Sequence, residues 1–106
     1  MKGPIQLVLL TGADCPLCDA MKEELSALKS LISFKVQSID IASFPELQKE
    51  YWDRIPYLFV NGRPFAKGQL DVQALKLRLL AAKAGLKQGA LPRLVQEALS
   101  WNTPGS

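Results

Sequence analysis

The sequence predicts a single α/β domain with a four-stranded mixed sheet, its elements following the order β-α-β-α-β-β-α, and an extra C-terminal helical segment. Short apolar runs alternate with stretches of helical periodicity, and an Asn-Gly pair joins the last two runs. The 106 residues, 48% of them hydrophobic, suffice for one compact core. We assign residues 1–88 to this domain and residues 89–106 to a C-terminal helix and a tail expected to be disordered.

The first strand and the first helix are predicted from a change in periodicity. Residues 5–10 form a nearly continuous apolar run that ends at Thr11, as expected for a strand buried on both faces. The following helix begins near Asp14, the expected N-cap, and Pro16 suits its first turn. Its apolar stripe, spaced for one helix face, consists of Cys18, Met21, Leu25 and Leu28.

A second strand and a second helix follow. Residues 34–40 show the alternation of a strand. Ser43 and Glu46 have the spacing of a capping box, which predicts a short helix that ends near residue 52.

The last elements form a hairpin followed by helices. Residues 57–60 and 63–67 lie on either side of Asn61-Gly62 and are therefore expected to be antiparallel strands. Asp71 is the expected N-cap of a helix that stops at Gly85. A further short helix is expected over residues 92–101.

Charge is distributed unevenly along the chain. The net charge is +3, with −2 on residues 1–60 and +5 on residues 61–106. We interpret the basic excess as the solvated faces of the C-terminal helices, with an acidic partner or an anionic membrane surface as the alternative. Aromatic residues do not interleave with these charges, so no nucleic-acid partner is expected.

The sequence shows no sign of membrane insertion or secretion. The apolar run near the N-terminus is too short to span a bilayer and is not followed by a cleavage site. We therefore expect no membrane span and a cytoplasmic location, where thiols are mostly kept reduced.

The two cysteines stand together in Cys15-Pro16-Leu17-Cys18, where the first strand meets the first helix. A bridge between residues so close in sequence closes almost no loop and adds little stability. A helix N-terminus, by contrast, stabilises a thiolate, which is the nucleophile in thiol chemistry. The pair therefore favours a catalytic role or metal binding over a structural one.

Other roles for the cysteine pair stay open. Zinc needs four ligands, and with two cysteines and no histidine a zinc site would have to be shared between two chains. An iron–sulfur cluster would likewise need external thiols. The pair could also be a relic on a protein-binding or redox-sensing module that binds a partner without turnover. We expect no metal site and no tightly bound cofactor.

Three short motifs fall at distinctive places in this pattern. The cysteine pair stands between Asp14 and Asp19 after the first strand, Arg54-Ile55-Pro56 enters the third strand, and residues 67–71 (KGQLD) lead into the third helix. Together they resemble the thioredoxin fold, and specifically the small glutaredoxin-like branch of that superfamily, over residues 5–85. The last motif occupies the position of the glutaredoxin G-G-x-D-D turn.

The resemblance implies thiol-disulfide oxidoreductase activity. It identifies Cys15 as the exposed nucleophile and Cys18 as the resolving thiol, and it implies a cis peptide bond before Pro56. Protein or glutathione disulfides are the implied partners of a monomer, with glutathione as a candidate co-substrate. The implied substrate-binding residues are Pro16, Leu17, Arg54, Ile55, Pro56, Lys67, Gly68 and Asp71.

The chain departs from typical glutaredoxins at several positions. Gly12 and Leu17 stand where those proteins have a basic and an aromatic residue, and the turn keeps only Gly68 and Asp71. A glutathione carboxylate therefore lacks one expected cation.

Charges elsewhere in the motifs bear on the same site. Lys67 or Arg54 could replace the missing cation. Asp14 opposes ionisation of Cys15 while the helix terminus favours it, so a moderately acidified thiol is expected.

Overall fold

The computed structural model describes residues 5–85 and 89–102 and contains the predicted mixed sheet. β1 (Gln6–Thr11) pairs in parallel with β2 (Lys35–Asp40) and antiparallel with β3 (Tyr57–Val60). β3 in turn pairs antiparallel with β4 (Arg63–Lys67), so the strand order is β2-β1-β3-β4. The predicted parallel start and antiparallel hairpin are both confirmed.

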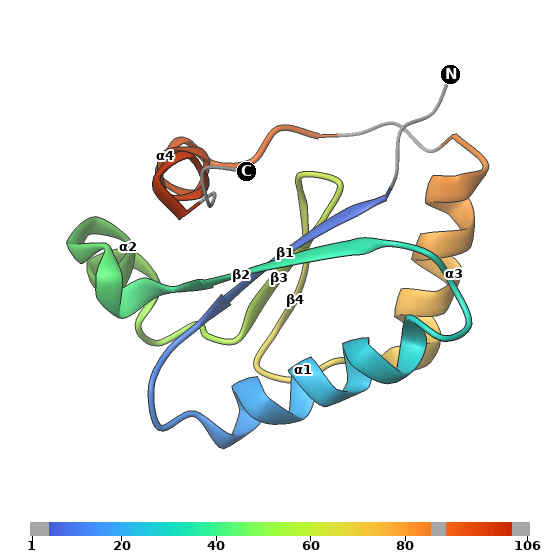
Figure 1. Cartoon of the computed structure of the whole chain (residues 1–106), viewed down its shortest axis with the longest axis horizontal. Coiled ribbons are helices and arrows are strands. Elements are labelled where there is room, and N and C mark those ends of the chain that lie inside the picture. The colour runs from blue at the N-terminus through green and yellow to red at the C-terminus, as the bar shows by residue number, and fades with distance from the viewer. Residues whose placement is uncertain (1–4, 86–88, 103–106) are drawn as a thin grey trace.

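Helices cover both faces of the sheet (Figure 1). α1 (Pro16–Leu28) and α3 (Val72–Lys83) pack on one face. α2 (Pro45–Tyr51), which follows a 3₁₀ turn over Ile41–Ser43, and α4 (Arg93–Asn102) pack on the other. Within residues 5–85 and 89–102, no helix is both long and apolar enough to cross a membrane.

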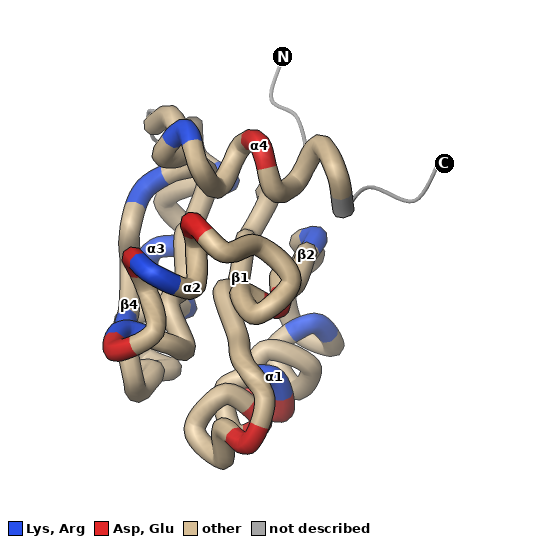
Figure 2. The backbone as a smooth tube through the Cα atoms, turned by 90° about the vertical axis from the view of Figure 1, so that its left-hand side faces the viewer, with Lys and Arg blue, Asp and Glu red and all other residues tan. Residues whose placement is uncertain are grey.

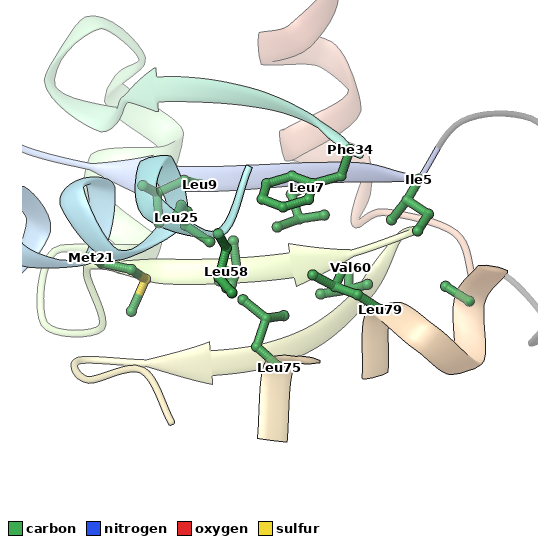
Figure 3. Close-up of a cluster of buried hydrophobic side chains, with 12 residues drawn as sticks. Ile5, Leu7, Leu9, Met21, Leu25, Phe34, Leu58, Val60, Leu75 and Leu79 are labelled. Atoms are coloured by element: carbon green, nitrogen blue, oxygen red, sulfur yellow. The ribbon is translucent and has the colours of Figure 1, made fainter. Parts of the chain in front are cut away.

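The core on the α1 and α3 side is built from alternate side chains of the central strands (Figure 3). Leu7 and Leu9 of β1 point to this side, and Leu58 and Val60 of β3 join them. The predicted stripe of α1 is confirmed, because each of its members is buried: Cys18, Met21, Leu25 and Leu28. Burying one large aliphatic side chain contributes about 1.5–3 kcal/mol to the free energy of unfolding. This cluster is therefore a main source of stability.

The opposite face of the sheet holds a second core that includes α4. Val8 and Leu10 of β1 and Phe59 of β3 point to this side, where Val95 and Ala98 of α4 are buried in the same cluster. The predicted helix over residues 92–101 is thus part of the packed structure. The predicted disordered tail falls largely on residues 103–106, which lie outside the described residues.

Truncating a buried side chain of α4 should measurably destabilise the protein. Val95 is fully buried, so Val95→Ala is expected to lower the free energy of unfolding by roughly 1–3 kcal/mol through lost burial and a residual cavity. Urea denaturation followed by circular dichroism checks this. Ser100→Ala, an exposed change on the same helix, is the matched control and should shift stability by less than about 0.5 kcal/mol. Equal effects of the two changes would mean that α4 is not docked.

The β3–β4 turn is held to two other segments. Asn61 (φ 47°) and Gly62 (φ 86°) adopt the left-handed conformations that a tight hairpin needs. The Asn61 side chain accepts a hydrogen bond from the Gln6 N–H (2.8 Å), and the Asn61 carbonyl accepts one from the Gly89 N–H (3.0 Å). A Cβ atom added to Gly62 would overlap the carbonyl oxygen of Gly89. The turn therefore contacts the segment that leads into α4 through a hydrogen bond and close backbone packing.

The N-cap expected from the sequence is confirmed at α3 but not at α2. The Asp71 carboxylate accepts a hydrogen bond from the Ala74 N–H (3.0 Å), which confirms the expected N-cap. The capping box predicted from Ser43 is wrong. Asp40 caps the 3₁₀ turn through the Ala42 N–H (2.9 Å), so Ser43 lies inside that turn and Phe44 becomes the N-cap of α2 without a side-chain hydrogen bond.

Candidate functional site

The cysteine pair occupies the N-terminal turn of α1. Cys15 is the N-cap and is half-buried, whereas Cys18 lies one turn inward with an exposed fraction of 1%. The two form a disulfide, with their Cα atoms 5.2 Å apart. The Cys18 N–H also points to the Cys15 sulfur at 3.1 Å. The helix start therefore presents one accessible sulfur, and the sheet side of the helix shields the other.

The predicted N-cap of α1 is wrong by one residue. Asp14 adopts a left-handed conformation (φ 51°), and Cys15 takes the extended conformation of the cap. Aspartate tolerates the left-handed region better than most side chains, so it can turn the chain into the helix. The sulfur of Cys15 then takes the capping position that a carboxylate would otherwise fill.

The second motif lies beside the loop that leads to Cys15. The Ile55–Pro56 peptide bond is cis, as the family resemblance implies, and Pro56 is buried. A Cβ atom added to Gly12 would lie 2.6 Å from the Cδ1 atom of Ile55. A larger residue at position 12 would therefore require the terminal methyl group of Ile55 to shift.

The third motif is tied to the second through the backbone. The Gly68 N–H donates a hydrogen bond to the Pro56 carbonyl (2.7 Å), and Gly68 has a positive φ of 78°. Nothing lies within 4 Å of a Cβ atom added at Gly68, so its conformation, and not crowding, favours glycine there. The side chain of Asp71 is used as the cap of α3.

Four of the eight predicted substrate-binding residues line two separate hollows. Leu17, which is 47% exposed, and Gly68 line a hollow of about 270 Å³ between α1 and the turn over residues 67–71. Arg54 and Lys67 line a separate hollow of about 410 Å³ beside β3 and β4. Pro16 is exposed in the first turn of α1, and Ile55 and Pro56 form the loop that contacts Gly12 and Gly68.

Residues that the sequence did not single out complete these hollows. Glu24 and Gln69 belong to the smaller one, and Tyr57, Pro64 and Phe65 belong to the larger one. Tyr57 directly follows Pro56, and this adjacency is the one sequence signal that could have drawn attention to it.

Two cationic side chains, Arg54 and Lys67, line the larger hollow. The guanidinium of Arg54 lies 5.7 Å from the centre of the Tyr51 ring and 4.0 Å from the Asp53 carboxylate.

Burial, followed by the charge of Glu50, raises the pKa of the Tyr51 hydroxyl above its ordinary value, while Arg54 acts in the opposite direction. Figure 2 views the molecule from the α2 side and shows charges of both signs around α2.

No metal centre is evident in the described part of the chain. Across residues 5–85 and 89–102, no three or more His, Cys, Asp and Glu side chains come together to hold an ion. A shared metal centre would therefore need ligands from outside these residues.

Comparisons with known proteins agree with this geometry. The family model described as "Glutaredoxin-like domain (DUF836)" matches residues 6–80. The "uncharacterized protein Rv0508" of Mycobacterium tuberculosis is 29% identical over 85 residues, which cover 76% of this chain and 88% of that protein. The solution structure of protein Ne2328 from Nitrosomonas europaea is 27% identical, with a TM-score of 0.64, and covers 74% of this chain and 95% of that one.

The fold also extends to more distant structures. Oxidized mitochondrial thioredoxin 3 from Saccharomyces cerevisiae is 16% identical, with a TM-score of 0.53, and covers 74% of this chain and 79% of that one. At this identity the likeness concerns the fold alone, which is the thioredoxin fold.

Proposed function

The chain belongs to the Glutaredoxin-like domain family, and on this basis we propose that it is a thiol-disulfide oxidoreductase with Cys15 as nucleophile and Cys18 as resolving thiol. The observation that carries the proposal is the disulfide between a half-buried Cys15 and a buried Cys18 at the start of α1. A bridge that closes so short a loop adds little stability. Reversible chemistry accounts for the pair better than structural crosslinking does.

The proposed reaction moves two electrons from the protein to a disulfide substrate. The Cys15 thiolate attacks one substrate sulfur and forms a mixed disulfide, and the other substrate sulfur leaves as a thiolate that takes up a proton. The Cys18 thiolate then attacks the Cys15 sulfur, which releases the second substrate thiol. The substrate disulfide is thereby reduced and the Cys15–Cys18 disulfide is formed.

Local structure supports this division of roles. The Cys18 N–H at the first turn of α1 points to the Cys15 sulfur, and the helix N-terminus favours negative charge at that position. Cys18 lies within bonding reach of Cys15 but is shielded from solvent, so it suits attack within the protein and not on a separate substrate. Two molecules of a monothiol such as glutathione, or one dithiol, would return the protein to its reduced state.

Stoichiometric oxidation of the reduced protein tests the proposal. Reduced protein freed of its reductant and mixed with excess oxidised glutathione or a disulfide-bonded protein should form one Cys15–Cys18 bridge per substrate disulfide reduced. Mass spectrometry and thiol counting check this. Because Cys15 is more accessible than Cys18, brief alkylation of the reduced protein should label Cys15 first.

The opposite outcome would favour the binding module. If neither substrate is reduced while both cysteines remain free thiols, the oxidoreductase proposal fails. Binding of a partner that is equal for the oxidised and reduced forms would then support the protein-binding alternative.

A further inference from the structure

The larger hollow lies at the end of the sheet where β1 leads to the cysteine pair, because Leu10 pairs with Tyr57 and Tyr57 pairs with Lys67, and it has the composition of an anion-recognition site. It has a volume of about 410 Å³, within the range of sites for small ligands or single side chains. We name it the Arg54–Lys67 hollow; its lining residues are Arg54, Tyr57, Pro64, Phe65, Ala66 and Lys67. Two of these are cations and none is acidic.

The two cations differ in how far their charge is already neutralised. Arg54 has a neighbouring carboxylate, Asp53, at 4.0 Å and also lies over the Tyr51 ring. Lys67 is exposed and forms no ion pair with any residue of the described part of the chain. Lys67 is therefore the stronger attractor for an incoming anion, and Arg54 is the second.

The remaining walls of the hollow are apolar and held in place. Tyr57 packs against Phe59 in an edge-on arrangement with ring centres 5.0 Å apart, and against Tyr51 at 5.4 Å. The Phe65 ring packs on the α1 and α3 side of the sheet, where the guanidinium of Arg78 lies 5.1 Å from its centre, so Tyr57 and Pro64 form the apolar wall on the α2 side. A fixed wall of this kind suits an apolar group attached to the anion better than a bare, fully hydrated ion.

Two residues that line the hollow are close in sequence to the Pro56 loop, which lies beside the loop leading to Cys15. Lys67 directly precedes Gly68, whose N–H is bonded to the Pro56 carbonyl, and Arg54 lies two residues before Pro56. Ile55, between them, faces Gly12 in the loop that leads to Cys15. A polypeptide bound at the cysteine pair could therefore extend along the Pro56 loop and place a nearby side chain in the hollow.

We infer that the Arg54–Lys67 hollow is a specificity subsite for disulfide-bearing polypeptides that carry an acidic residue next to an aromatic or aliphatic residue close to their reactive cysteine. The carboxylate would pair with Lys67 and Arg54, and the apolar neighbour would lie against Tyr57 and Pro64. This inference rests on the proposed oxidoreductase function, and it assigns the substrate class.

Matched peptide substrates test the inference. Each peptide has one cysteine joined by a disulfide to 2-thiopyridine, an uncharged leaving group, and a dipeptide a few residues away that is Asp-Phe, Asn-Phe or Asp-Ala. With reduced protein under single-turnover conditions, the rate of thiopyridone release gives the second-order rate constant of the first exchange step. We expect the Asp-Phe peptide to be preferred over the Asn-Phe peptide by about tenfold at low ionic strength, because two cations act on one exposed carboxylate. The Asp-Ala peptide should fall between them.

Charge-neutralising variants identify the residues responsible. Lys67→Gln should remove most of the preference for Asp-Phe over Asn-Phe, Arg54→Gln should remove less, and the double variant should remove it entirely, with the preference taken in each variant as the ratio of the two rate constants. Lys49→Gln, an exposed neutralisation on α2 outside the hollow, is the matched control and should leave the preference intact. No preference in the native protein, or equal losses for both peptides in the Lys67 and Arg54 variants, would overturn the inference.

A binding measurement separates this inference from the proposed function. The oxidised protein, labelled with ¹⁵N, is titrated with a cysteine-free peptide containing Asp-Phe. Salt-sensitive shifts at the amides of residues 57 and 65–67 are expected, and they should be absent with Asn-Phe and in the Lys67→Gln variant. Binding without disulfide reduction would reject the oxidoreductase and keep the anion site. Reduction without these shifts would keep the oxidoreductase and reject the site.

Discussion

Replacing Cys18 with serine is expected to leave the protein bound to its substrate through a mixed disulfide. Cys15 keeps its place at the start of α1, so the first exchange step proceeds, but the buried sulfur that would resolve the intermediate is gone. In the absence of added thiols, the Cys18→Ser protein should accumulate a nearly stoichiometric adduct. Mass spectrometry of the unreduced protein should show the added mass on Cys15.

The complementary change, Cys15→Ser, should abolish the reaction. The remaining Cys18 is 1% exposed and cannot reach a substrate disulfide without opening of the helix start. Turnover of the two-cysteine reaction is expected to fall by at least about a thousandfold, as for loss of other nucleophiles. Retained activity in Cys15→Ser, or an adduct that forms there and not in Cys18→Ser, would reverse the assigned roles.

Adding one methyl group at Gly62 is expected to be among the most destabilising small changes in the chain. Alanine at this position would adopt an unfavourable positive φ, and its Cβ would overlap the carbonyl oxygen of Gly89, which is backbone and cannot move without displacing the segment before α4. The left-handed conformation and the overpacking together should cost about 2–5 kcal/mol. Chemical denaturation of Gly62→Ala measures the loss.

Gly68 supplies the matched control for this change. Its φ of 78° is close to the 86° of Gly62, but a Cβ atom there meets nothing within 4 Å. Gly68→Ala should therefore show the conformational cost alone, about 1–2 kcal/mol. The difference between the two variants measures the contact between the hairpin turn and residue 89, and equal losses would show that this contact contributes nothing to stability.

The fold could be predicted from the sequence because its strongest signals are local. Three local patterns each predict an element that the structure contains: the apolar run of β1, the Asn61-Gly62 turn and the apolar stripe of α1. The cap positions of α1 and α2 could not be predicted, since each depends on a neighbouring element. The 3₁₀ turn capped by Asp40 moves the start of α2 past Ser43, and the left-handed Asp14 moves the start of α1 to Cys15.

The site was only partly accessible to sequence reasoning. The motifs located the cysteines, Pro56 and Gly68, because these residues carry conformational or chemical constraints visible in their type. The separation of Arg54 and Lys67 from Leu17 was not visible, since it depends on which side of the Pro56 loop each side chain occupies. Tyr57 and Phe65 were missed because aromatic residues in short strands usually fill the core.

The burial of α4 bears on how this chain can be shortened. The family match ends at residue 80, yet Val95 and Ala98 belong to the same buried cluster as Val8, Leu10 and Phe59, which lie inside the matched region. A chain cut after α3 would remove part of the cover of this core and expose apolar surface, and contiguous apolar surface promotes self-association. The smallest fragment expected to stay monodisperse therefore extends beyond residue 98, past the residue at which the family match ends.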